Sequence, residues 1–131
     1  MKTCGECGES KSVEAFSRRA RMPDGLMWRC KSCCVKASRK CQIERRTKAK
    51  RLLGNKCMCP GCPETNPSFL TFDHINNNGH LEGSNRDSNI AIRYVIKNLI
   101  QTKYQLLCWN CNSGRWANGG ICPHLIDVGG Y

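Results

Sequence analysis

The sequence has no long hydrophobic run. In its 131 residues, no stretch approaches the about 18 consecutive apolar residues of a membrane-spanning helix. The opening residues, MKTCGECGES, also lack the apolar core and small-residue cleavage site of a secretory signal. We therefore expect a cytoplasmic protein without a membrane partner, in a reducing compartment where disulfides rarely persist.

Acidic residues are scarce. The chain has 10 Asp and Glu against 21 Lys and Arg, so its formal net charge is +11. A surplus of this size in so small a protein favours polyanionic partners. Charge alone does not separate DNA, RNA and ribosome as partners. The cations are concentrated in one segment, which argues against a merely soluble basic surface.

Cysteine, in contrast, is abundant, with 12 residues. In a reducing compartment this density indicates metal binding rather than a disulfide framework. Eight cysteines form four Cys-x-x-Cys knuckles, the spacing that lets two thiolates reach one tetrahedral zinc. Four knuckles predict two structural Cys4 zinc sites, the first with Cys4, Cys7, Cys30 and Cys33, the second with Cys59, Cys62, Cys108 and Cys111.

One ligand of the second site stays open, because Cys57 could take the place of Cys59. Unless Cys57 is that ligand, we expect it to be an ordinary thiol, like the other remaining cysteines, Cys34, Cys41 and Cys122. We expect His124 to pack against or cap the tail. Closed Cys4 coordination leaves no position for water, so both zinc sites are expected to be structural.

Residues 1–33 are predicted to form an N-terminal zinc ribbon or finger. Within it, Pro23 and Gly25 of MPDG suit a tight turn between two hairpin arms, AFSRRAR and LMWRC. Such a unit is too small to fold on a hydrophobic core. Zinc would supply its stability, on the order of 10 kcal/mol for a structural site.

Residues 34–54 are predicted to form a basic linker helix, because residues 34–53 lack Pro and Gly and Gly54-Asn55 is a stop signal. The segment carries eight cations against Glu44 alone. Self-repulsion argues against such a helix facing only water, so we expect phosphate contacts. The candidates are Arg39, Lys40, Arg45, Arg46, Lys48, Lys50 and Arg51.

Residues 55–131 contain the second pair of knuckles, the strand-like FLTFDHI and YQLLCWN, and a helical pattern, RDSNIAIRYVIKNLIQT. Asp87 or Ser88 could cap this helix. Its apolar face over residues 88–102 could be either a core face or the interface of a homodimer. The predicted core residues are Ile92, Val95, Ile96, Leu99 and Ile100; Trp28, Trp109 and Trp116 are expected to pack in the core or beside zinc.

If the second zinc site joins its two knuckles, the segments after them are held together. Asp73 and His74 would then lie near Asn112, which directly follows Cys111. Neighbouring strand residues point to opposite faces, so Asp73 and His74 can share a site only where the strand bends into the loop INNNG. The sequence therefore predicts an acid, an imidazole and an amide at a site separate from zinc.

The knuckle, DHI and LCWNCN together resemble an HNH nuclease with the ββα-metal fold, and are similar to the recombination endonuclease VII-like branch and related phage HNH proteins. The resemblance covers residues 55–124 and extends loosely to the N-terminal ribbon. It implies a small α+β protein with a zinc ribbon, a basic helix and an HNH nuclease domain in residues 55–131. A phage-encoded protein of this kind would act in the host-cell cytoplasm.

The resemblance further implies that Asp73 and Asn112 bind one catalytic divalent cation and that His74 is the general base. Carboxylate and amide oxygens suit Mg²⁺ or Mn²⁺, and a neutral imidazole can take a proton from water. Arg115 is predicted to contact DNA, although related proteins usually have Lys there, and His80 is a weaker candidate. The family's central asparagine could be any of Asn76, Asn77, Asn78, Asn85 and Asn89, and we favour the first three as a group.

These features predict a metal-dependent endonuclease for double-stranded or branched DNA, with RNA as an open alternative. The rival hypothesis is a zinc-stabilised nucleic-acid-binding module without catalysis.

Overall fold

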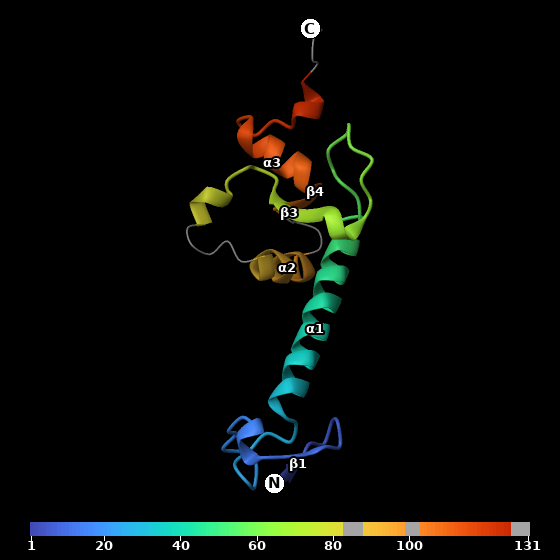
Figure 1. Ribbon diagram of the computed structural model, residues 1–131. Helices are drawn as coiled ribbons and strands as arrows, with labels where there is room; N and C mark the ends of the chain where they lie inside the picture. Colours follow the sequence, from blue (N-terminus) through green and yellow to red (C-terminus); the bar gives the residue numbers. More distant parts are fainter. Residues whose placement is uncertain (83–87, 99–102, 127–131) are drawn as a thin grey trace. The chain divides into compact units, whose positions relative to one another are not determined.

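The computed structural model describes residues 1–82, 88–98 and 103–126. Within these ranges the chain is a small α+β protein with three α-helices and two antiparallel two-stranded sheets, which confirms the predicted class (Figure 1). It divides into two compact units, Met1–Glu44 and Arg45–Tyr131. No helix among the described residues has the length and apolarity needed to cross a membrane.

The first unit begins with a short antiparallel pair, in which β1 (Lys2–Thr3) lies beside β2 (Ser10–Lys11). A 3₁₀ turn, η1 (Val13–Ala15), follows. Three cysteines and one aromatic side chain make the buried core of this unit, and so little apolar surface gives it little stability without metal. These core residues are Cys4, Phe16, Cys30 and Cys33.

The predicted MPDG turn is present. The amide of Gly25 donates to the carbonyl of Met22 at 2.9 Å, and Gly25 has φ +70°, a conformation that glycine adopts without strain. The arms of the predicted hairpin are reduced to one antiparallel bridge between Arg18 and Leu26.

The basic helix, α1 (Lys31–Leu52), has 22 residues and begins slightly before the predicted position. It ends where the sequence indicated, because Gly54 and Asn55 adopt positive φ angles of 91° and 53°. The amide of Gly54 donates to the carbonyl of Arg51 at 3.0 Å and closes the last turn.

The second unit is built on an antiparallel hairpin of β3 (Leu70–His74) and β4 (Tyr104–Cys108). One side of the hairpin contacts α3 (Trp109–Ala117), which starts directly after β4. The buried Tyr104 packs with α2 (Ser88–Lys97), and Figure 1 shows the hairpin between the two helices. Three 3₁₀ turns complete this unit: η2 (Pro67–Phe69), η3 (Gly79–Glu82) and η4 (Pro123–Leu125).

Two clusters form the core of this unit. Beside α2 lie Ala49, Ala91, Ile92, Val95 and Tyr104. Around the cysteines lie Leu70, Leu106 and Leu107. The predicted burial of Ile92 and Val95 is confirmed, and Ile96 is half-buried; Leu99, Ile100 and the predicted cap Asp87 lie outside the described residues.

Candidate metal centres and catalytic site

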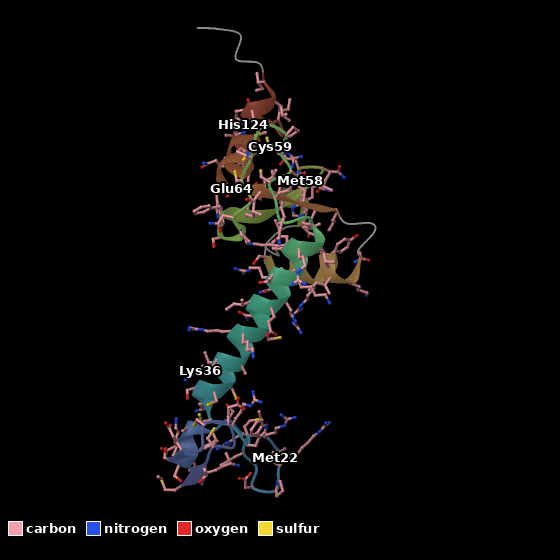
Figure 2. The ribbon with its side chains drawn as sticks, turned by 90° about the vertical axis from the view of Figure 1, so that its right-hand side faces the viewer. Met22, Lys36, Met58, Cys59, Glu64 and His124 are labelled. Atoms are coloured by element: carbon pink, nitrogen blue, oxygen red, sulfur yellow. The ribbon has the colours of Figure 1, made fainter. Side chains whose placement is uncertain are left out.

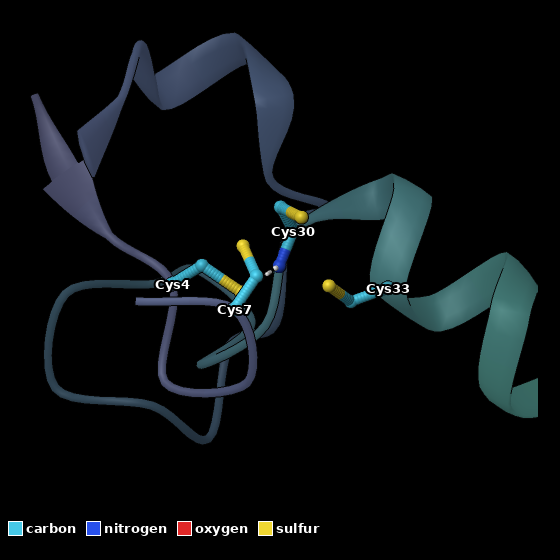
Figure 3. Close-up of side chains that lie close together, drawn as sticks. All are labelled: Cys4, Cys7, Cys30 and Cys33. Carbon is cyan, nitrogen blue, oxygen red and sulfur yellow. Dashed lines mark hydrogen bonds between the residues drawn. The ribbon is translucent and has the colours of Figure 1, made fainter. Parts of the chain in front are cut away.

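The first predicted cysteine cluster forms in the N-terminal unit. The sulfur atoms of Cys4, Cys7, Cys30 and Cys33 lie within 4.8 Å of one another. Figure 3 shows these four side chains close together. Tetrahedral zinc with Zn–S bonds of about 2.3 Å needs sulfurs about 3.8 Å apart. The spacing and chemistry of this cluster therefore fit one structural zinc.

The surroundings of this cluster favour the thiolate form of Cys4 and Cys30 by lowering their pKa values. A hydrogen bond with the Ser32 hydroxyl lowers the pKa of Cys30 to about 6, while the hydrogen bond with Cys30 raises the pKa of Cys33 to about 12. The amide of Cys30 donates to Cys4 Sγ at 3.2 Å, and Lys11 Nζ lies 3.8 Å from Cys30 Sγ. Since thiolates are the metal-binding form, zinc would displace the remaining protons.

In the second cluster, Cys57 takes the place predicted for Cys59. The sulfur atoms of Cys57, Cys62, Cys108 and Cys111 lie within 4.8 Å of one another. Cys57 is held there because the amide of Cys108 donates to its Sγ at 3.3 Å. The amide of Met58 also pairs with the carbonyl of Leu106 at 2.8 Å, which aligns this segment with β4. These four thiols could hold the second zinc.

Cys59 joins a third group of donors. Its Sγ and those of Cys111 and Cys122, with His124 Nδ1, lie within 4.8 Å of one another, so Cys111 belongs to both groups. Figure 2 shows Cys59 and His124 side by side, with 3.7 Å between Sγ and Nδ1. We expected Cys122 to be an ordinary thiol and His124 to be a packing residue, so the sequence-based prediction missed this group. The Cys-x-His spacing was a usable signal for it. Cys34 and Cys41 belong to none of the groups found in the described ranges.

Asp73 lies where β3 meets α3. Its Oδ2 accepts a hydrogen bond from Gln105 Nε2 at 2.9 Å and forms an ion pair with Arg115. The two ion-paired side chains are only 11% and 14% exposed, respectively. Gln105 is the cross-strand partner of Asp73, so this carboxylate is fixed from both β4 and α3.

Arg115 holds the loops around Asp73 together. Its guanidinium donates to the carbonyls of His74, the last residue of β3, and of Ile75, and to that of Gly120 after α3. All three of its nitrogens are therefore engaged within the protein. This arrangement gives Arg115 a positioning role, and its DNA contact stays a prediction.

Asn112 lies on α3, one turn before Arg115, and is half-buried. Residues three apart on a helix are neighbours on one face. Asn112 therefore lies on the same face of α3 as Arg115, the residue that binds Asp73.

The side chain of His74 lies on the opposite face of the hairpin from that of Asp73. Strand pairing continues through His74, which lies opposite Tyr104, so Asp73 and His74 alternate faces and the predicted bend between them is absent. The imidazole packs on the Tyr104 ring with centroids 4.7 Å apart. A Cβ at Gly79 would lie 2.8 Å from His74 Nδ1, so the ring occupies the space that a side chain there would need.

The turn begins at the next residues. The amide of Asn77 donates to the carbonyl of His74 at 3.0 Å, and Asn77 has φ +52°. A Cβ at Gly120 would lie 3.1 Å from Asn77 Nδ2, which puts the two loops in contact. Among the three favoured asparagines, Asn77 has this loop-forming geometry. Asn85 and the side chain of His80 lie outside the described part of the chain.

The cations of α1 are exposed with one exception. The exposed ones are Lys31, Lys36, Arg39, Lys40, Arg45, Arg46, Lys48 and Arg51. Lys50 is only 9% exposed, its Nζ donates to the carbonyl of Pro67, and burial lowers its pKa. The predicted phosphate contact of Lys50 is therefore wrong, because its side chain faces the interior of the second unit.

Two tryptophans expected to pack are on the surface. Trp109 and Trp116 are 59% and 80% exposed. They are seven residues apart on α3 and so share a face, with Asn112 close to the same line. Exposed aromatic rings beside a candidate site are available for stacking on bases.

Comparison with protein-family models, curated proteins and solved structures finds no match to this chain. Its function must therefore be argued from its own residues.

Proposed function

We propose that the protein is a metal-dependent HNH-type endonuclease that hydrolyses DNA phosphodiester bonds. The observation that carries this proposal is the β3–β4–α3 arrangement, in which Arg115 ties the helix bearing Asn112 to the carboxylate of Asp73. An antiparallel hairpin followed at once by a helix, with these donors at the junction, is the arrangement that the HNH resemblance implies.

The donor set fits a hard divalent cation. Among the described residues, the hydrogen bonds to the Asp73 carboxylate all go to Oδ2, which leaves Oδ1 for a metal. Asn112 would add its amide oxygen, and such oxygens suit Mg²⁺ or Mn²⁺. When bound, the cation would stabilise the charge that develops on the phosphate.

The chain's own residues supply the remaining functions. His74 would accept the proton of the attacking water, with its ring held between Tyr104 and Gly79. The exposed cations of α1 would neutralise phosphates, and Trp109 and Trp116 would contact bases beside Asn112. Arg115 would keep the Asp73 carboxylate in position.

One observation favours a second candidate. Asp73 is engaged by two protein groups, and His74 leaves the strand on the opposite face. Both residues would then be structural, and the protein would be a zinc-stabilised nucleic-acid-binding module without catalysis.

The test is cleavage of supercoiled plasmid by zinc-loaded protein with Mg²⁺, with Mn²⁺ and with neither. The divalent ion is omitted rather than chelated, because a chelator would also remove zinc. His74→Ala and Asn112→Ala are compared with Ser113→Ala, an exposed neighbour on α3, at matched zinc content and DNA affinity. Divalent-dependent nicking that both site variants lose and Ser113→Ala retains supports the enzyme. Binding without cleavage of plasmid, branched, single-stranded or RNA substrates supports the module.

A further inference from the structure

We propose that the second unit holds a two-zinc cluster in which the thiolate of Cys111 bridges both ions, so that the chain binds three zinc ions. One ion of the pair takes Cys57, Cys62 and Cys108 as its other ligands. The second takes Cys59, Cys122 and His124. This inference concerns metal binding alone and does not depend on nuclease activity.

The distances in the third donor group match tetrahedral zinc. With Zn–S near 2.3 Å and Zn–N near 2.05 Å, a tetrahedron separates two sulfurs by about 3.8 Å and a sulfur from a nitrogen by about 3.5 Å. His124 Nδ1 lies 3.7, 3.4 and 3.5 Å from the sulfurs of Cys59, Cys111 and Cys122. Cys59 and Cys122 are 3.3 Å apart, slightly closer than the ideal. One small ion fits between these four donors.

Two glycines make room for the tail that brings Cys122 and His124 to the cluster. A Cβ at Gly61 would lie 2.9 Å from His124 Cβ. A Cβ at Gly114 would lie 2.9 Å from Pro123 Cδ. A side chain at either position would push the tail away. Glycine at both positions therefore allows the tail to pack closely. The tail therefore packs closely against Gly61 and Gly114 where it returns to the cluster.

Burial and charge also suit a shared cluster. Cys59, Cys111 and Cys122 are each about 5% exposed or less. Six thiolates and one neutral imidazole around two dications carry the same net charge as four thiolates around one dication. A second ion therefore adds no excess charge, and it gives every buried thiol of this group a metal partner.

The first measurement is zinc stoichiometry of the full chain by native mass spectrometry with elemental analysis. We expect three ions per chain, two in His124→Ala, and three in the control Cys41→Ser, whose thiol is exposed. Two ions in the unmodified protein, unchanged by His124→Ala, would overturn the proposal. The zinc stoichiometry of the unmodified chain tests the proposal even if a variant folds poorly.

The bridge itself is tested by cadmium substitution and proton–cadmium correlation NMR. The β protons of Cys111 should correlate with two cadmium signals, and those of Cys57 and Cys122 with one each. If three ions bind but the Cys111 protons correlate with a single cadmium, the bridging thiolate is refuted. DNA cleavage plays no part in either measurement, so the failure of this proposal and of the nuclease proposal can be told apart.

Discussion

Replacing Arg115 by Met should destabilise the second unit strongly. Within the described part of the chain, the substitution leaves the Asp73 carboxylate, 11% exposed, with one hydrogen bond, from Gln105. Removing one partner of a buried ion pair costs about 3–5 kcal/mol, because the other charge stays buried without compensation. The carbonyls of His74 and Gly120 also lose a donor. Since the pair retains a little solvent contact, we expect about 3 kcal/mol.

Thermal unfolding of the zinc-loaded chain measures this loss. For a unit of this size, each kcal/mol lowers Tm by about 4–8 °C, so Arg115→Met should lower it by more than about 10 °C. The matched control is Arg93→Met, which removes an exposed arginine from α2 and should change stability by less than about 0.5 kcal/mol. Adding Asp73→Asn to Arg115→Met should recover more than about 1 kcal/mol, since no buried charge is then left unpaired.

The opposite result would restore the role predicted from sequence. If Arg115→Met is as stable as Arg93→Met but binds DNA more weakly, with a smaller salt dependence, then Arg115 contacts a phosphate and its contacts with Asp73 are incidental. If Arg115→Met loses both stability and DNA affinity, Arg115→Lys separates the two roles of the side chain. Lysine keeps the charge that a phosphate contact needs but lacks the guanidinium's planar array of donors.

Three further predictions follow from exposure and packing. Lys48→Met should lower the magnitude of the log–log salt slope of DNA binding by about 0.9, whereas the neighbouring Lys50→Met, at a buried position, should leave it unchanged; equal effects would contradict the placement of Lys50. Removing zinc should unfold residues 1–44, since a structural site contributes on the order of 10 kcal/mol, and NMR signals of this unit should return with Zn²⁺ but not with Mg²⁺. Gly79→Ala should displace the His74 ring from Tyr104. Under the proposed function, it should also lower cleavage more than about tenfold at unchanged zinc content. An unchanged NMR chemical shift of the His74 ring would count against the close contact.

Local signals in the sequence predicted several parts of the fold. The lack of Pro and Gly before Gly54-Asn55 predicted the end of α1, and helical spacing predicted the burial of Ile92 and Val95. The knuckle spacing sufficed for the first cysteine cluster, because Cys34, next to Cys33, falls outside the Cys-x-x-Cys spacing and does not join the cluster. Each of these features depends on a few neighbouring residues.

The features that the sequence did not determine depend on contacts between distant segments. Cys57 and Cys59 both have spacings to Cys62 that zinc allows, and the choice rests on a hydrogen bond from the amide of Cys108. Lys50 differs from Lys48 only because the last turn of α1 packs inside the second unit. Charge patterns carry no information about these long-range contacts.

The cysteine cluster and the proposed site are coupled through the first turns of α3. Cys108 and Cys111 begin this helix, Asn112 follows at once, and Arg115 lies one turn later. A helix rotates by about 100° per residue, so the ligand position of Cys111 also fixes the direction of Asn112. Under the proposed function, a variant that loses Cys111 would therefore lose cleavage whether or not Asn112 binds a cation. His124→Ala leaves the four thiols of Cys57, Cys62, Cys108 and Cys111 in place, so it can remove the second ion without removing the anchor of the helix. Cleavage retained in His124→Ala and lost in Asn112→Ala would assign the chemistry to the amide and the positioning to the Cys57 cluster.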